Sequence, residues 1–313
     1  MLEAAGIAPA PLGAVAVMVA FAVDGLAGEP GDRWHPVAWI GRALSAAGAP
    51  WPGAAPRRAF MLGTLAWFGG AMLCATAAFG LVRGIDSIGR ALGAAVTLPG
   101  LILGVALKPM LSFRMLRDEV RAVELAIAAG IEPARARLRR LVSRDTSSLS
   151  ESVIRESAIE SFAENLNDSF VAPLFWFTLG GLPAAALYRF VNTADAMWGY
   201  RGRFEWAGKW AARADDVLSY VPARITALLI AAAAPASIRG LRRAAAITPS
   251  PNSGWPMAMM ALALGVRLSK PGVYALNASA RPPGPRDLER GIAVGTRAAW
   301  AAAALSAGAL WWR

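Results

Sequence analysis

The chain has 313 residues and a formal net charge of +11, from 32 Lys and Arg against 21 Asp and Glu. Hydrophobic residues make up 56 % of the sequence and charged residues only 17 %, where a soluble globular domain carries about 25 % charged residues. This composition excludes a disordered or fibrous chain and indicates a membrane protein. The single His, His35, and the single Cys, Cys74, exclude disulfide scaffolds and metal sites built from several His or Cys residues. A bound metal ion would need oxygen ligands.

Several apolar segments approach the ~20 residues that span the hydrocarbon core of a bilayer. Four contain no charge and two contain a single Arg; in chain order they are 4–23, 59–82, 91–107, 169–188, 217–238 and 292–312. The first follows Glu3 and no Lys or Arg, so we expect a retained helix and not a signal peptide. The pattern predicts an all-α, polytopic membrane protein with about five spanning helices, forming one domain over residues 1–313.

The segment 169–188 carries helix breakers in two places. Pro173 lies near its start, and the sequence GGLP from Gly180 divides it into halves of about ten residues. At ~1.5 Å per residue, neither half can cross a bilayer alone. We therefore expect a re-entrant or broken helical hairpin, with one Pro-kinked spanning helix as the alternative.

Basic residues are densest between Lys108 and Arg155, and basic loops favour the cytoplasmic side of a membrane. This bias predicts an inner or plasma membrane protein whose loops at about 24–58, 108–168 and 189–224 face the cytoplasm. The same bias explains the net charge without nucleic acid, because the basic residues flank apolar segments and no nucleic-acid-binding motif is present. The sequence also lacks the phosphate loop GxxxxGK[ST], a dinucleotide-binding fingerprint and the nucleophile elbow GxSxG.

The stretch from Ser147 to Asp168 is predicted to be a helix capped by Ser148 or Ser150. Four acids recur in it at i, i+4 spacing, so they share one face: Glu156, Glu160, Glu164 and Asp168. Like charges at this spacing repel each other unless a cation compensates. Mg²⁺, held by one or two carboxylates with Asn165 nearby, is one candidate. A solvated acidic face paired with Arg155 is the alternative, and spacing alone favours it.

Two further polar clusters lie beside apolar segments, where unpaired charges are costly and functional use is the first hypothesis. Asn192 and Asp195 are one helical turn apart, and a later cluster contains Lys209, Arg213, Asp215, Asp216 and Arg224. Snorkelling of Lys and Arg to the membrane surface is the alternative. Near the amino end, Asp24, Glu29 and His35 also follow an apolar segment, although a lone His is weak evidence for a site.

Seven ordered motifs extend over nearly the whole chain. They are GEPGDRWHPVAWIGR from Gly28, SRDTSSL from Ser143, ESFAENLNDSFVAPLFWFTLGGLP from Glu160, YRFVNTADAMWGYR from Tyr188, ARADDVLSYVPAR from Ala212, SPNSGWP from Ser250 and KPGVYALN from Lys270. Together they resemble the adenosylcobinamide-phosphate synthase family of cobalamin biosynthesis, of the CobD/CbiB type. Small departures from the family pattern include Glu29 in place of Asp and Ser143 in place of Gly.

The resemblance implies a carbon–nitrogen ligase that uses ATP and Mg²⁺. It would join (R)-1-amino-2-propanol, or its O-phosphate, to the propionate carboxyl of adenosylcobyric acid. Other membrane-associated cobalamin-assembly enzymes are possible partners. The alternatives are an intramembrane prenyl or phospho-alcohol transferase, a transporter, and a scaffold of the same pathway.

The resemblance also implies roles for particular residues. The implied metal ligands are Glu160, Glu164, Asp168 and Asp195. The implied catalytic residues are Arg144, Arg213, Asp215 and Asp216. The implied substrate or phosphate ligands are Glu29, His35, Asp145, Thr146, Asn165, Asn192, Lys209 and Arg224.

Overall fold

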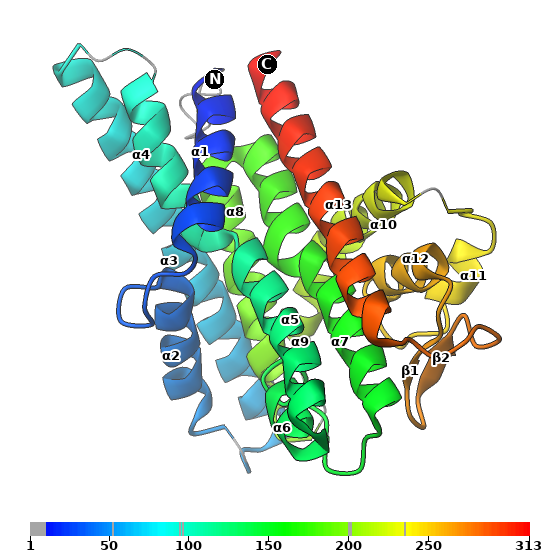
Figure 1. The fold of residues 1–313 in the computed structure, drawn as a ribbon. Helices are drawn as coiled ribbons and strands as arrows, with labels where there is room; N and C mark the ends of the chain where they lie inside the picture. The colour runs from blue at the N-terminus through cyan, green and yellow to red at the C-terminus, as the bar shows by residue number, and fades with distance from the viewer. Residues whose placement is uncertain (1–10, 52, 94, 96, 200–201, 235) are drawn as a thin grey trace. The chain divides into compact units, whose positions relative to one another are not determined.

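The computed structural model describes residues 11–51, 53–93, 95, 97–199, 202–234 and 236–313. The described chain is mostly helical, as expected, with one two-stranded antiparallel sheet (Figure 1). The elements are α1 (Leu12–Ala27), α2 (Pro36–Gly48), α3 (Pro56–Ala91), α4 (Thr97–Leu107), the short η2 (Lys108–Met110), α5 (Phe113–Ala129), α6 (Ile131–Leu138), α7 (Glu151–Leu166), the π-helical η3 (Asn167–Val171), α8 (Ala172–Trp198), α9 (Lys209–Leu218), α10 (Tyr220–Ala233), α11 (Leu241–Ala245), α12 (Gly254–Leu264), β1 (Leu268–Lys270), β2 (Tyr274–Leu276) and α13 (Pro285–Trp311).

The described residues group into two compact units. Unit 1 comprises those within 1–112, 172–218 and 303–313, and unit 2 comprises 113–171 and 219–302. Both units combine segments that are distant in the sequence. The prediction of a single domain stays a prediction.

Among the described residues, three helical stretches are long and apolar enough to span a membrane: Pro56–Ala91, Thr97–Ala129 and Glu151–Trp198. The pair α9 and α10, bent by 46°, makes a fourth if it counts as one span. These stretches indicate a membrane protein. The structure has three or four candidate spans among its described residues, whereas about five were expected. The first expected span lies partly outside the described residues, and α1 has only 16 residues. Helix α13 has 27 residues and is not among these candidates.

The helix α8 breaks at the predicted glycines. Gly180 (φ −133°, ψ 19°) and Gly181 (φ 65°, ψ −162°) are both non-helical, and the positive φ of Gly181 suits glycine because it has no Cβ. The π-helical turn η3 ends just before Pro173, which has no N–H to donate to the helix. The expectation of two ten-residue halves is wrong, since helical backbone continues to Glu151 on one side and Trp198 on the other. The re-entrant hairpin stays a prediction.

In unit 1, α1 packs along α4, and α8 packs against both α2 and α3 (Figure 1). The aromatic core includes Trp51 and Trp198, whose ring centroids are 4.7 Å apart in an edge-to-face arrangement. Helix α3 approaches its neighbours closely through glycine. A methyl group added to Gly63 would lie 2.2 Å from the carbonyl oxygen of Ala207.

Gly63→Ala is therefore expected to destabilise the protein by about 1–3 kcal/mol, because the backbone around Ala207 must move. Gly69, on the same helix, is the matched control, since a methyl group there meets no described atom within 4 Å. Gly69→Ala should stabilise the helix by roughly 0.5–1 kcal/mol. Thermal unfolding in one detergent measures both variants. Equal melting temperatures for the two would contradict the close packing of α3 against Ala207.

In unit 2, α7 packs against α5, α6, α12 and β1. Phe113, at the start of α5, contacts the rings of Phe162 and Phe170 at centroid distances of 6.4 and 5.5 Å. The β1–β2 hairpin turns at Pro271 and Gly272, where the φ of +74° at Gly272 matches a type II turn. Strand β1 of this hairpin packs against α7.

Candidate functional site

The acids of α7 are buried at the start of the predicted stripe. Glu156 is 0 % exposed and Glu160 is 2 % exposed, so the solvated acidic face is wrong for these two residues. Their charges are compensated by cations from other segments of unit 2. Arg144 pairs with Glu160 at 2.9 Å, and Arg267 pairs with Glu156 at 2.9 Å. Ser269 donates a further hydrogen bond to Glu156.

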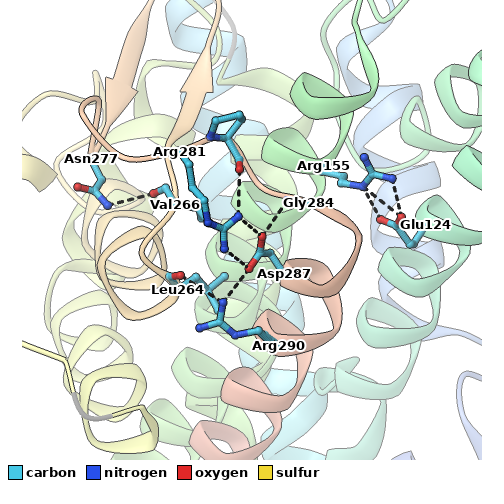
Figure 2. A network of polar contacts seen from close by, with 10 residues as sticks. Glu124, Arg155, Leu264, Val266, Asn277, Arg281, Gly284, Asp287 and Arg290 are labelled. Atoms are coloured by element: carbon cyan, nitrogen blue, oxygen red, sulfur yellow. Dashed lines mark hydrogen bonds and ion pairs between the residues drawn. The ribbon is translucent and has the colours of Figure 1, made fainter.

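Arg155, expected to pair with the acidic stripe, contacts other carboxylates, among them Glu151 at the start of α7 at 3.6 Å. Its guanidinium donates to both carboxylate oxygens of Glu124 on α5, at distances of 2.7–3.1 Å (Figure 2). This forked pair links α7 to α5. The acidic stripe is therefore served by Arg144 and Arg267, which come from loops of unit 2.

The β1–β2 hairpin supplies partners that the sequence interpretation missed. Ser269 lies on β1. The phenol of Tyr274 on β2 donates to the sulfur of Met257 at 3.9 Å and lies within electrostatic range of Glu160. Burial and the negative charge of Glu160 raise the pKa of Tyr274 well above its ordinary value, so the phenol stays protonated and donates. The motif KPGVYALN contains Tyr274 and was part of the family resemblance without an assigned role, whereas Ser269 lies just before the motif and had no signal.

Tyr274→Phe is expected to lower stability by roughly 0.5–1.5 kcal/mol, because the phenol loses its contact with Met257 and its place beside Glu160. The matched control is Tyr220→Phe, because Tyr220 is 52 % exposed on α10. The effects of Tyr274→Phe and Glu160→Gln should not add in the double variant, since the two groups interact electrostatically. Additive effects on thermal unfolding would contradict the contact.

Both members of the Arg144–Glu160 pair retain a polar atom that could bind a ligand. Oε1 of Glu160 and Nη1 of Arg144 are buried and have no hydrogen-bond partner among the described residues. Glu164, one turn further along α7, is half-buried and lies within electrostatic range of Glu160, Asp168 and Lys270. Buried polar atoms without partners are uncommon, so this point of the molecule fits a polar ligand.

The donor set limits which metal site is possible here. No group of three or more His, Cys, Asp or Glu side chains in the described part of the chain is arranged to hold a metal ion. The predicted fourth ligand, Asp195, lies on α8 in unit 1, whereas Glu160, Glu164 and Asp168 lie in unit 2. The residues therefore fit Mg²⁺ held by one or two carboxylates together with water and phosphate oxygens, and not a cage of protein ligands.

Three other predicted site residues of unit 2 make local structural contacts. Asp145 accepts hydrogen bonds from the backbone N–H and hydroxyl of Ser147, both at 2.9 Å, and these lower its pKa. The hydroxyl of Thr146 donates to the carbonyl of Arg135. The amide of Asn165 donates to the carbonyl of Ser161. Within the motif SRDTSSL, Asp145 and Thr146 thus shape the loop that presents Arg144.

Arg224, predicted to bind phosphate, is held between aromatic rings. Its guanidinium carbon lies 3.5 Å from the ring centroid of Tyr220 and 4.6 Å from that of Trp255. Its N–H groups donate to carbonyls of Tyr220 and Pro251 and to the side chain of Asn252. These contacts connect α10 to the motif SPNSGWP, which favours a role in fixing that loop.

The start of α13 contains a second buried carboxylate network in unit 2. Figure 2 shows Asp287 between two guanidinium groups: Arg281 donates at 2.6 and 2.9 Å and Arg290 at 2.8 Å. The backbone N–H of Gly284 donates to it at 2.8 Å, as a residue of this position does in a capping box. Burial alone would raise the pKa of Asp287, but these donors hold it below its ordinary value. The network anchors the loop RPPGP to α13.

In unit 1, Glu29 and His35 belong to a buried ionic network. Nζ of Lys108 lies 2.7 Å from Oε2 of Glu29 and 3.2 Å from Oδ1 of Asp24. Nε2 of His35 lies 2.9 Å from the same Glu29 oxygen, and Nδ1 accepts from the N–H of Val37 at the start of α2. Burial would raise the pKa of Glu29, but His35 and Lys108 lower it overall. The sequence interpretation identified Glu29 and His35 but did not identify Lys108.

The remaining predicted residues lie on α8 and α9 of unit 1. Asn192 donates to Asp215 at 3.3 Å, so the structure brings these two predicted residues together. Asp216 is half-buried on the same helix, and Arg213 is exposed. The ammonium of Lys209 lies 4.1 Å from the ring centroid of Trp206. Asn192 and Asp215 thus form a second polar group, which belongs to unit 1.

Comparison with known proteins gives a consistent result. The family model described as CobD/Cbib protein matches residues 17–298. The cobalamin biosynthesis protein CobD of Rhodobacter capsulatus is 38 % identical over 305 residues, covering 91 % of this chain and 93 % of that protein. The probable cobalamin biosynthesis protein CobD of Methanothermobacter thermautotrophicus is 41 % identical, covering 83 % and 85 %. The Dehalococcoides mccartyi protein of the same name is 37 % identical, covering 87 % and 89 %. No solved structure matches the chain significantly.

Proposed function

Because the chain belongs to the CobD/Cbib family, we propose that it acts in cobalamin biosynthesis as an adenosylcobinamide-phosphate synthase. The reaction joins the amine of (R)-1-amino-2-propanol, or of its O-phosphate, to the propionate carboxyl of adenosylcobyric acid. A carboxylate is a poor electrophile at neutral pH, so the proposal includes ATP as the activating co-substrate. When bound, Mg²⁺ would supply charge neutralisation to the phosphate groups.

The observation that supports this chemistry best is the Arg144–Glu160 pair. Each partner has one buried polar atom that no described residue hydrogen-bonds, Nη1 of Arg144 and Oε1 of Glu160. Arg144 is suited to donate to a phosphate or carboxylate oxygen, as guanidinium groups commonly do. Glu160 and Glu164 are suited to contribute carboxylate oxygens to Mg²⁺. Arg144 orients Glu160 through the 2.9 Å contact, so little reorganisation is needed when the ligand binds.

The second polar group supports a role in handling the amine. Asp215 receives the Asn192 amide and lies on α9 beside Asp216. One of these carboxylates would accept the proton that the attacking amine loses when the amide bond forms. Asn192 orients Asp215. Lys209 and Arg213, which lie on the same helix as Asp215, contribute positive charge that attracts phosphate.

We further propose that the motif loops face the cytoplasm, where ATP is available, in the inner or plasma membrane. The basic segment from Lys108 to Arg155 supports this orientation. Cysteines are introduced at Ser147 and Ser87 in a Cys74→Ser background and treated with a membrane-impermeant reagent. The cysteine at position 147 should react in inverted vesicles, and the cysteine at position 87 should react in right-side-out vesicles. Labelling of both positions from one side would overturn the orientation.

Turnover by the purified protein tests the function. The protein in detergent is given adenosylcobyric acid, aminopropanol phosphate, ATP and Mg²⁺, and the corrinoid products are identified by mass. We expect a product heavier by the amide-linked aminopropanol phosphate, and its absence when ATP is omitted. Folded protein that forms no product with either the free or the phosphorylated amino alcohol would contradict the proposal.

A further inference from the structure

A cavity of about 520 Å³ lies within unit 1. Its walls are α2, α3 and α8, with Ala106 and Met110 at one side. Within the described part of the chain, no charged residue contributes to its lining, and the polar side-chain groups there are the thiol of Cys74 and the indoles of Trp39 and Trp198. Such a lining cannot recognise nucleotides, corrinoid amides or amino alcohols, because their polar groups would lose water without gaining partners. The cavity therefore suits a hydrocarbon ligand.

The cavity opens on the apolar surface of a membrane span. Its α3 wall extends from Ala66 to Leu81, about 22 Å along the helix at ~1.5 Å per residue. All of this wall falls within the uncharged segment 59–82, which Arg58 and Arg83 delimit. Leu73 and Leu81 line the cavity yet are 67 % and 48 % exposed. Exposed leucines on a spanning helix face lipid, so a ligand can enter sideways from the bilayer.

One rim of the cavity carries aromatic and basic residues. Trp39 lines the cavity and is 48 % exposed, and its indole donates to the carbonyl of Arg33 at 2.8 Å. The guanidinium of Arg33 lies 5.4 Å from the ring centroid of Trp34. Arg42, one helical turn after Trp39, is also exposed. Tryptophan and arginine in this combination are typical of the membrane surface, where they contact lipid head groups.

From these observations we propose that the cavity binds one anionic phospholipid. An acyl chain occupies the space along α3, and Arg33 and Arg42 contact the phosphate of the head group. The length of the α3 wall exceeds the ~15 Å of a single leaflet, half of the ~30 Å hydrocarbon core, so one chain fits along it. The bound lipid would fill the space between α2, α3 and α8 and so fix the position of α2, which begins at Pro36.

Variants that fill the cavity test the proposal. Ala77 lines the cavity and is exposed, so Ala77→Phe should occupy the space of the acyl chain. The neighbouring Thr76 is exposed and does not line the cavity, which makes Thr76→Phe the matched control. Ala43→Leu fills the same cavity from α2, in case Ala77→Phe does not fold. Native mass spectrometry of protein purified in a mild detergent counts the phospholipids that remain bound. We expect one phospholipid on the wild type and on Thr76→Phe, and none on either filled variant.

The single cysteine provides an independent readout, because Cys74 lies in the cavity wall. In delipidated protein, added phosphatidylglycerol should slow the reaction of Cys74 with an apolar thiol reagent about tenfold, as expected for an occupied cavity. Phosphatidylcholine should need about tenfold higher concentration than phosphatidylglycerol to slow the labelling of Cys74 equally. Replacement of Arg33 and Arg42 by Gln should abolish this difference between the two lipids. An unchanged labelling rate, or equal lipid retention by Ala77→Phe and Thr76→Phe, would overturn the site. Equal protection by both lipids would overturn the anionic head group.

Discussion

Lys108→Met is expected to destabilise unit 1 by about 3–5 kcal/mol, enough to lower the yield of folded protein sharply. The ammonium of Lys108 is 4 % exposed and lies near the carboxylates of Asp24 and Glu29 and the carbonyl of Leu111. Methionine retains the length of the side chain but not the charge, so two buried carboxylates lose a shared cation. Thermal unfolding and the monodisperse fraction after purification measure the effect.

Two comparisons isolate the charge from the packing. Arg114→Met removes an ion pair with Asp118 whose side chains are 35 % and 48 % exposed, so it should cost no more than about 1 kcal/mol. Combining Lys108→Met with Asp24→Asn and Glu29→Gln removes the excess negative charge and should recover much of the lost stability. A Lys108→Met protein as stable as Arg114→Met would contradict the buried network.

The same network predicts a pH dependence of stability. The folded pKa of Glu29 lies below its ordinary value of 4.5, so folding favours the ionised carboxylate. Its contribution is present above the unfolded pKa and is lost as the pH falls through the folded pKa. Acid unfolding of the wild type should therefore begin below about pH 4.5, and Glu29→Gln should remove part of this dependence.

Glu160→Gln is expected to reduce turnover by about 10²- to 10³-fold, as the loss of one preorganised charged contact does in other enzymes. Glutamine keeps the shape of the side chain but loses the charge that pairs with Arg144 at 2.9 Å. It also replaces one carboxylate oxygen by an amide group, and the proposal assigns Oε1 of Glu160 to ligand binding. The assay is corrinoid product formation per folded protein, measured over a range of Mg²⁺ concentrations.

Glu156→Gln provides the contrast, because Glu156 lies one turn earlier on α7 and is equally buried. Its carboxylate is engaged by Arg267 and Ser269, so the variant should lower the melting temperature while turnover per folded molecule changes little. Arg144→Met should reduce both quantities, since it leaves Glu160 buried without its cation. If Glu160→Gln retained wild-type turnover and Mg²⁺ dependence, the α7 group would not be the site of phosphate chemistry.

The sequence by itself determined the class of protein and the position of its helices. Uncharged segments identify α3 and the apolar part of α8, because a bilayer demands about 20 residues without charge whatever the rest of the fold. The i, i+4 spacing of acids located α7, whose first residue, Glu151, follows Ser150, although the side chain of Ser150 makes no capping hydrogen bond. Gly180 and Gly181 marked the break in α8, since backbone conformation at glycine is a local property. The ordered motifs identified the family, which the comparisons confirm.

Only the tertiary structure decided which charges pair with which. Spacing along α7 shows that Glu156 and Glu160 share a face, but it cannot show that Arg267 and Arg144 neutralise them from loops more than ten residues away in the chain. It likewise could not show that Arg224 is enclosed by Tyr220 and Trp255. Periodicity reports the environment of a helix face, whereas a buried ion pair depends on long-range packing that brings distant segments together. For that reason the sequence predicted the polar residues of the site better than it predicted their partners.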